Sequence, residues 1–319
     1  MISFIIIGRN ESWKLTKCLV SVYKTIYSNN LKDCEVIYVD SNSSDDSIKR
    51  AQAYTEIKIF MLTGEYNPAI ARNIGANESS GDVLFFIDGD MEIVETALYS
   101  FYSEMSGLKY PFCSGNFRNI ECIGSDKNLS RLYYKNLKNR FDYTVGGLFL
   151  INRKLWNAAG GMKTIFRKSQ EIDFGLRLAK KGFFLYRLST VLANHYTINY
   201  NSPGRKWKML FNKDQLYGRA LLYRMNLLNI YTYRRLIRND FTLVVLASCI
   251  LSVLILKDFK IILFYLLPVI LRSFFKNKFK LGSLLSGILY FTLRDIQQFL
   301  GFFLFWPISP RKITYEKIY

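Results

Sequence analysis

The sequence predicts an α/β protein in which a mostly parallel sheet is covered by helices on both faces, followed by a C-terminal α-helical membrane-associated region. Over the first 90 residues, short and nearly continuous apolar runs alternate with longer amphipathic segments, which is typical of strands buried on both faces. Long apolar runs after residue 240 predict the membrane-associated region. The expected strands cover residues 2–7, 34–40, 57–62 and 83–90, and the expected helices cover 12–28, 45–54 and 69–79.

Polar residues follow three of these strands at the point where each strand ends. Gly8-Arg9-Asn10-Glu11 follows the first, Asp40 to Asp45 ends the second, and Asp88-Gly89-Asp90 ends the last. Ligands of parallel α/β sheets collect at the carboxyl ends of the strands, so these residues predict a shared binding edge. A dinucleotide fold would have Gly-x-Gly-x-x-Gly after the first strand and a P-loop would have Gly-Lys-Ser/Thr, and both motifs are absent.

Charge divides the chain. The formal net charge is +19, of which residues 201–319 contribute +14. We therefore expect an α/β domain at 1–200, a basic amphipathic juxtamembrane linker at 201–240 and a membrane-associated helical region at 241–319. The basic residues border apolar runs instead of alternating with aromatic residues along a stripe, which argues against nucleic acid as a partner. Five scattered cysteines without CxxC spacing argue against disulfides and a zinc site.

The apolar runs of the tail favour membrane lipid as a partner. Residues 241–256 are uncharged and would form a helix of ~24 Å, slightly shorter than a ~30 Å hydrocarbon core. Two arrangements remain possible for this run and the next: a tight membrane hairpin or a shallow re-entrant pair. The run 281–306 contains Arg294, Asp295, Gln297 and Gln298, so we expect an amphipathic or re-entrant placement. Basic residues at 205–240, 272–280 and 311–317 predict that these flanks face the cytoplasm.

A series of short motifs then occurs in order along residues 1–200. The motifs are Ile5 to Glu11, Val39 to Asp45, Ala71 to Gly75, Asp88 to Asp90, Gly146-Gly147 with Arg153, Gly160-Gly161, and Gln170 to Phe174. Together they resemble the family-2 glycosyltransferases with a GT-A fold, a Rossmann-like architecture, and the tail looks like that of members that build exopolysaccharides or lipid-linked glycans. Two motifs depart from the family pattern: Ile7-Gly8-Arg9-Asn10 stands where Pro-Thr-Tyr-Asn is usual, and Gln170-Glu171 stands where Glu-Asp is usual.

The resemblance implies a nucleotide-sugar donor and Mn²⁺ or Mg²⁺, metals that hard oxygen ligands suit. It implies that Asp90 binds the metal and that Asp88 contacts the ribose and the metal with its water shell. Asp40 would accept a hydrogen bond from uracil, or would form an Asx-turn or helix cap. Arg72 would contact the diphosphate or base, or would be a solvated helix residue. The remaining donor-binding residues are Ile7, Arg9, Asn10, Glu11 and Gly89.

The resemblance also implies the catalytic residues. Glu171 matches the second acid of the family motif and would be the general base, with Asp173 positioning the acceptor or supporting a helix start. His195, the single histidine, would complete the metal site or lie hydrogen-bonded in the core. Trp156 is expected in the core instead of under a sugar.

With this resemblance, the residues predict an inverting glycosyltransferase that moves a sugar, from UDP-sugar by preference, to a glycan or polyprenyl-linked acceptor by metal-assisted single displacement. Its location would be the cell inner membrane or plasma membrane, with the catalytic domain in the cytoplasm. Two alternatives stay open: a nucleotidyltransferase, which needs a basic glycine-rich phosphate loop, and a membrane-anchored sugar-nucleotide-binding or scaffold protein without activity.

Overall fold

The computed structural model describes residues 1–123, 126–132, 138–197, 203–276, 281–310 and 313–318, and the chain forms two compact units. Unit 1 comprises residues 1–199 and 309–319, and unit 2 comprises 200–308. This differs from the expected division, because residues 201–240 belong with the helices after them and the last eleven residues return to the α/β unit. Four basic residues of the predicted flanks lie outside the described residues: Lys278, Lys280, Arg311 and Lys312.

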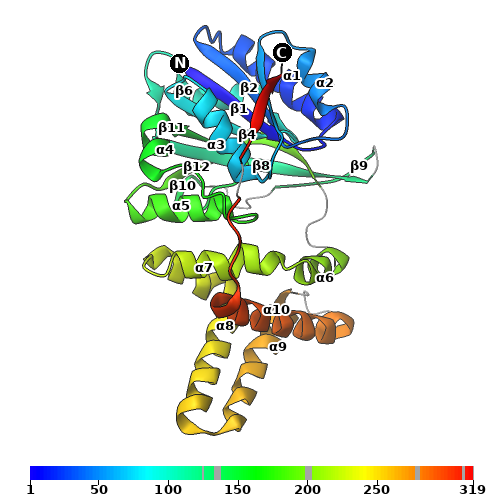
Figure 1. Cartoon of the computed structure of the whole chain (residues 1–319), viewed down its shortest axis with the longest axis vertical. Coiled ribbons are helices and arrows are strands. Elements are labelled where there is room, and N and C mark those ends of the chain that lie inside the picture. Colours follow the sequence, from blue (N-terminus) through cyan, green and yellow to red (C-terminus); the bar gives the residue numbers. More distant parts are fainter. Residues whose placement is uncertain (124–125, 133–137, 198–202, 277–280, 311–312, 319) are drawn as a thin grey trace. The chain divides into compact units, whose positions relative to one another are not determined.

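The first half of unit 1 follows the predicted alternation of strands and helices (Figure 1). The strands run parallel in the order β3, β2, β1, β4, so each amphipathic segment between them forms a crossover helix. The strands are β1 (Ile2–Gly8), β2 (Cys34–Asp40), β3 (Ile57–Leu62) and β4 (Val83–Asp88), and the helices are α1 (Trp13–Ser28), α2 (Ser47–Gln52) and α3 (Pro68–Glu78).

The second half makes the sheet mixed. β11 (Phe149–Asn152) is antiparallel to both β4 and β8 (Phe112–Ile123), and β12 (Leu185–Thr197) runs parallel to β8. Antiparallel neighbours need no crossover helix, so the strand-helix alternation ends at β4. The other elements are β5 (Met91–Ile93), η1 (Glu95–Ser100), β6 (Tyr102–Ser103), β7 (Gly107–Leu108), β9 (Asp126–Leu132), β10 (Arg140–Asp142), α4 (Arg153–Ala159) and α5 (Gln170–Lys180).

Alternate residues of β1 supply the two core layers of unit 1. Phe4 and Ile6 are buried on the α1 side, while Ile5 and Ile7 are buried on the α3 side. This two-sided burial explains why the strand is apolar at consecutive positions. Trp156 lies in the α3-side layer against Phe86 and Phe174, with ring centroids 4.6 and 4.9 Å away, as expected for a core residue.

Unit 2 is helical. In the part of the chain that the structure describes, α8 is the one helix long and apolar enough to cross a membrane. Its backbone leaves helical geometry at Asp240, and η3 with α9 returns alongside it (Figure 1). The elements are α6 (Pro203–Phe211), η2 (Leu216–Ala220), α7 (Leu221–Met225), α8 (Ile230–Leu256), η3 (Phe259–Tyr265), α9 (Leu266–Lys276), η4 (Leu281–Ser283) and α10 (Leu284–Leu304).

Helix α10 has its polar face inside and its apolar face outside. Arg294, Asp295 and Gln298 are buried, and Arg294 Nη2 donates to Asp295 Oδ1 at 2.5 Å. The exposed apolar side chains recur three or four residues apart from Leu285 through Leu289, Leu293, Ile296 and Leu300 to Phe303, and Leu304 follows directly. The helix is amphipathic, and its expected amphipathic or re-entrant placement in a membrane stays a prediction.

The end of the chain forms an additional edge strand in unit 1. β13 (Tyr315–Ile318) pairs antiparallel with β3, and Thr63 N donates to Thr314 O at 2.9 Å just beyond the ladder. The Tyr315 ring meets Phe60 edge-on at 5.9 Å, and its hydroxyl donates to Glu78 Oε1 at 2.5 Å. The strand covers backbone groups of β3 that would otherwise form an open edge.

Removing the Tyr315 ring should loosen this edge strand. We expect Tyr315→Ala to lower the stability of unit 1 by about 1 kcal/mol, the scale of one aromatic pair, and so to lower its Tm by about 2–4 °C. Thermal unfolding of the detergent-solubilised protein would measure the change. Tyr315→Phe is the matched control, because it keeps the ring and loses only an exposed hydrogen bond. Equal Tm values for both variants would show that the ring contact with Phe60 adds no stability.

Candidate active site

Two strand ends bring three carboxylates together at one edge of the sheet. Asp88 ends β4 and Asp90 follows it, while Glu11 lies just beyond β1, the parallel neighbour of β4. Gly89 N donates to Ile7 O at 2.8 Å, and a side chain at Gly89 would crowd that oxygen and Glu11. Ile7 and Gly89 therefore hold the acidic turn against β1 through backbone contact.

Gly147 permits Asp88 to occupy its position. A Cβ atom built on Gly147 would lie 1.8 Å from Asp88 Oδ2, far inside van der Waals contact. Any side chain at Gly147 would have to displace the carboxylate. Gly147 of the sequence motif therefore leaves the space that the acidic turn occupies.

Arg72 of α3 joins the acidic turn to α5. Its guanidinium is 1% exposed, so it is not a solvated helix residue. Arg72 Nη2 donates to Asp88 Oδ1 at 2.6 Å, and Nη1 donates to Glu171 Oε1 at 3.2 Å. Arg72 therefore ion-pairs with two predicted site carboxylates, Asp88 and Glu171, which belong to different elements.

Glu171 and Asp173 lie in the first turn of α5 but have different surroundings. Glu171 contacts Arg72 and accepts a hydrogen bond from Gln170 Nε2 at 3.0 Å. Asp173 is completely buried and accepts from Arg177 Nε at 2.8 Å. Because no part of Asp173 reaches the surface, the geometry supports a structural role for it on α5 and not the acceptor contact.

His195 of β12 contacts the acidic turn. Its Nε2 lies 3.1 Å from Asp90 Oδ2, and its Nδ1 lies 2.8 Å from Asn119 Oδ1 on β8. Asn119 therefore fixes the orientation of the imidazole. Nothing in the local sequence pointed to Asn119, since it is one residue within a long strand and meets His195 only through the parallel pairing of β8 with β12.

Burial and neighbouring carboxylates raise the pKa values of Glu11 and Asp88. Burial raises the pKa of Glu11 to about 7, with further contributions from the charges of Asp90 and Asp88. Burial likewise raises the pKa of Asp88 to about 6, against the opposing charge of Arg72. Burial alone would lower the pKa of His195, but its hydrogen bond to Asp90 and the nearby charge outweigh burial and raise it. The acidic edge therefore carries negative charge that a cation would stabilise.

A divalent metal ion fits this edge. Asp90 Oδ1 is buried and has no hydrogen-bond partner among the described residues, so a hard oxygen ligand is available there. Within the described ranges, no three His, Cys, Asp or Glu side chains are close enough to form a metal site by themselves. Asp88, Asp90 and His195 stay the predicted metal ligands, and ligand phosphates would complete the coordination, as is usual for Mg²⁺.

Asp40 organises the neighbouring loop after β2. It is fully buried, and its Oδ1 accepts from Ser43 N at 2.7 Å while Oδ2 accepts from the Tyr38 and Ser43 hydroxyls at 2.7 and 2.5 Å. This is the turn-forming alternative of the sequence analysis. Asn10 joins the loop to β1, because its Oδ1 accepts from Ser44 N at 2.8 Å.

Arg9 stands at the exposed side of the same edge. Its guanidinium lies 3.9 Å from the centre of the Tyr66 ring, which is 43% exposed. Sequence reasoning did not identify Tyr66, because a lone tyrosine in a loop carries no recognisable pattern. The pair presents a cation and an aromatic surface at the border of the site.

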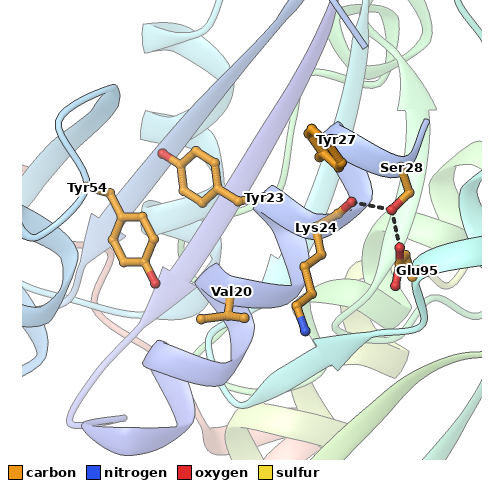
Figure 2. A pocket seen from close by; sticks show the side chains of 7 residues that line it. All are labelled: Val20, Tyr23, Lys24, Tyr27, Ser28, Tyr54 and Glu95. Carbon is orange, nitrogen blue, oxygen red and sulfur yellow. Dashed lines mark hydrogen bonds between the residues drawn. The ribbon is translucent and has the colours of Figure 1, made fainter. Parts of the chain in front are cut away.

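A separate hollow of about 430 Å³ lies on α1 and does not contain the acidic turn (Figure 2). The Tyr23 and Tyr54 rings stack there with centroids 5.0 Å apart, and the Ser28 hydroxyl donates to Glu95. Glu95 is the only acid that lines the hollow. It therefore lacks the paired carboxylates found at the sheet edge.

Sequence relatives match parts of the chain. The chain is 32% identical over 119 residues to Glycosyltransferase AglE of Haloferax volcanii, which is 36% of this chain and 38% of the relative. It is 28% identical over 145 residues to UDP-Glc:alpha-D-GlcNAc-diphosphoundecaprenol beta-1,3-glucosyltransferase WfgD of Escherichia coli, covering 44% of this chain and 56% of the relative. The matches thus span 38–56% of the length of these curated relatives.

Solved structures of low sequence identity share the fold. Mannosyltransferase PcManGT from Pyrobaculum calidifontis, in complex with GDP-Man and Mn²⁺, has a TM-score of 0.60 at 11% identity and covers 93% of this chain and 86% of its own. S. aureus TarS 1-349 in complex with UDP-GlcNAc has a TM-score of 0.52 at 15% identity and covers 93% and 89%. The predicted GT-A fold is confirmed by these neighbours. The model of glycosyl transferase family 2 matches residues 3–172, more than half of the sequence, and the chain therefore belongs to glycosyl transferase family 2.

Proposed function

We propose that this protein is an inverting glycosyltransferase that transfers a sugar from a nucleotide-sugar donor to a glycan acceptor. One observation carries the proposal: Arg72 connects a carboxylate of the acidic turn, Asp88, to a separate carboxylate, Glu171, within one ion-paired chain. Metal-assisted sugar transfer needs one carboxylate that holds a cation beside the departing diphosphate and another that takes the proton of the acceptor hydroxyl. The site offers both on one rigid frame.

The donor would bind across the ends of β1, β2 and β4. Arg9 with Tyr66 is placed to contact a base or ribose, and Asp40 supports the loop through Ser43. UDP is the favoured nucleotide because the printed names of WfgD and of the TarS complex include a UDP-sugar. PcManGT was crystallised with GDP-Man, so the fold itself accommodates either nucleotide.

Asp90, with Asp88 and His195 beside it, would hold Mn²⁺ or Mg²⁺ together with donor phosphates. Bound there, such an ion would stabilise the negative charge that grows on the departing diphosphate. The chain's own part is to keep the ligands in place: Asn119 orients His195, and Gly147 leaves room for Asp88. Arg72 adds a fixed positive charge beside the same region.

Glu171 would accept the proton of the attacking acceptor hydroxyl. The Glu171 side chain is partly exposed, whereas the Asp173 side chain is completely buried. Attack from the side opposite the leaving diphosphate is a single displacement, which inverts the anomeric carbon. Gln170 replaces the first carboxylate of the family pattern with an amide, which donates a hydrogen bond to the remaining carboxylate, Glu171.

The acceptor would be lipid-linked and unit 2 would hold the enzyme at the membrane. The outward apolar face of α10 and the exposed apolar residues of α8 and α9 suit contact with lipid. The WfgD name also describes a diphosphoundecaprenol-linked acceptor. We place the enzyme at the inner or plasma membrane, with unit 1 on the cytoplasmic side where nucleotide sugars are made.

A donor screen tests the proposed activity. Purified, detergent-extracted protein is incubated with nucleotide sugars and Mn²⁺, and nucleotide release is recorded with and without EDTA. Release from one donor that stops with EDTA supports the proposal. Release that continues undiminished in EDTA would contradict the metal role, and no release with any donor and acceptor would contradict the activity.

Asp90→Asn should abolish turnover. The substitution removes the charge of the carboxylate whose Oδ1 is available to a cation, so we expect nucleotide release to fall by about 10²–10³-fold. Titration of Mn²⁺ with the donor present should show weaker metal binding. Glu56→Gln, on the exposed surface, is the matched loss of one carboxylate charge and should leave both measurements unchanged. Normal Mn²⁺ affinity in Asp90→Asn would contradict the assignment.

Glu171→Gln should separate donor binding from transfer. The amide cannot accept a proton but keeps the size of the side chain, so donor affinity should persist while transfer falls by about 10²–10⁴-fold. Calorimetric donor titration and single-turnover transfer would measure the two effects. Asp173→Asn serves as the comparison and should act through a lower Tm, since it disrupts a buried ion pair with Arg177. Full transfer by Glu171→Gln would exclude Glu171 as the base.

Gly147→Ala should reduce activity without adding a polar group. The new methyl group would displace Asp88, and a misplacement of ~1 Å can cost about 10²-fold in rate. Nucleotide release at saturating donor would report the loss. Gly182→Ala introduces the same methyl group at a position where it meets no atom within 4 Å, although its positive φ adds some backbone strain. A wild-type rate in Gly147→Ala would show that the space beside Asp88 is unimportant.

A further inference from the structure

Unit 2 contains an apolar groove between α7, α8 and α10. Its volume is about 350 Å³, and most of its walls are aliphatic and aromatic. This is about twice the size of a ~150 Å³ apolar cavity that holds one benzene, so it has room for a chain segment of about ten to fifteen carbon atoms. Its main walls are Leu243, Ala247 and Leu251 on α8 and Phe299, Phe302 and Phe303 on α10.

The rim of the groove belongs to the apolar outer surface of unit 2. Leu251 is 59% exposed and Phe303 is 58% exposed, although both line the groove. Leu227, at the α7 side, is 44% exposed. A hydrocarbon chain could therefore enter from a surrounding lipid phase without crossing a polar barrier.

Two polar oxygens of residues that line the groove have no hydrogen-bond partner among the described residues. They are Thr232 Oγ1 and Gln298 Oε1, and their residues are 3% and 1% exposed. Gln298 Nε2 donates to Gln215 Oε1 at 3.1 Å, so the Gln298 oxygen can only accept a hydrogen bond, whereas the Thr232 hydroxyl can donate one. Leaving such a donor unpaired is costly, and a pure hydrocarbon occupant would not relieve the cost. The Thr232 hydroxyl therefore points to an occupant that carries an acceptor oxygen.

A cation borders the groove. Arg224 Nη1 donates to Phe302 O at 3.0 Å, and its guanidinium lies 4.4 Å from the Trp306 ring centre. Arg234 follows the lining residue Tyr233 in the chain and lies 5.3 Å from the Tyr231 ring. These charges complement a phosphate or diphosphate head group at the membrane surface.

We propose that this groove binds the head-proximal isoprene units of a polyprenyl-diphosphate-linked acceptor. The proposal rests on the lipid-linked acceptor of the proposed function and names its binding site. The apolar walls would hold about two to three isoprene units, a number set by the groove volume. The Thr232 hydroxyl would donate a hydrogen bond to an oxygen of the diphosphate end, and Arg224 would face the diphosphate. A phospholipid carries two acyl chains on one head group, which suits a single-chain groove less well.

Photocrosslinking tests the site without requiring turnover. The full-length protein in nanodiscs is exposed to benzophenone-labelled geranylgeranyl diphosphate, and labelled peptides are mapped by mass spectrometry. We expect labelling on α8 and α10 that unlabelled geranylgeranyl diphosphate suppresses. Phosphatidylglycerol at the same concentration should not suppress it. Equal suppression by phosphatidylglycerol would identify a bulk-lipid groove and overturn the proposal.

Two variants and a control locate the binding. Ala247→Phe fills the groove and Thr232→Val removes one hydroxyl at nearly constant shape, and we expect labelling to fall by about tenfold and about threefold, respectively. Leu256→Phe, at a 67% exposed position outside the groove, should label normally. Because Thr232→Val adds no bulk, it stays informative if Ala247→Phe does not fold. Unchanged labelling of folded Thr232→Val and of any folded Ala247→Phe would overturn the proposal.

Kinetics distinguish this proposal from the proposed function. In an active enzyme, Thr232→Val should raise KM for a prenyl-linked acceptor and leave kcat unchanged, because the groove contributes binding to the ground state and transition state alike. Groove labelling in a protein that releases no nucleotide from any donor would contradict the proposed activity while retaining the lipid site. Sugar transfer with nucleotide release but without specific labelling would contradict the lipid site while retaining the proposed activity.

Discussion

The buried guanidinium of Arg72 is the interaction on which the arrangement of the site depends. Burial of this guanidinium removes a full positive charge from water, and ion pairs with Asp88 and Glu171 offset the desolvation cost. Since these groups come from α3, β4 and α5, the charge can be stabilised only when the three elements are in place. The same contact sets the position of the acidic turn relative to the candidate base, so folding and site assembly are one event.

The first half of the sheet was predictable because its signals are local. Consecutive apolar residues in β1 identify a strand buried on both faces, and parallel pairing then brings Glu11 and Asp88 to one edge. The side-chain roles needed longer-range information. Glu171 and Asp173 are two residues apart on one helix turn. Asp173 is completely buried, whereas Glu171 is partly exposed and contacts Arg72. Only the packing of α5 decides which carboxylate is accessible.

Other parts of the structure depend on pairings that leave no local pattern. Asn119 meets His195 because β8 and β12 lie side by side, although 76 positions separate the two residues. β13 is four residues long and contains two charged residues, so its alternation is too brief to distinguish from a loop. Its place at the edge of β3 follows from the free backbone groups of that strand, which any suitable segment of the chain can pair with. The domain boundaries differed from expectation for this reason.

Unit 2 reverses the usual relation between burial and polarity, and this reversal bears on where it works. Asp240 is buried and accepts hydrogen bonds from Arg219 and Tyr223, while Arg294 and Asp295 pair inside α10. In water, exposing the leucine and phenylalanine face of α10 would cost about 25 cal/mol for each Å² of apolar surface, and burying these charges would add a desolvation penalty. In a lipid environment the first cost disappears, and the charges must pair with one another because no water is present to bond them. The distribution of side chains in unit 2 is therefore the one expected of a helical unit whose surroundings are apolar, and it supports the proposal that unit 2 contacts a membrane.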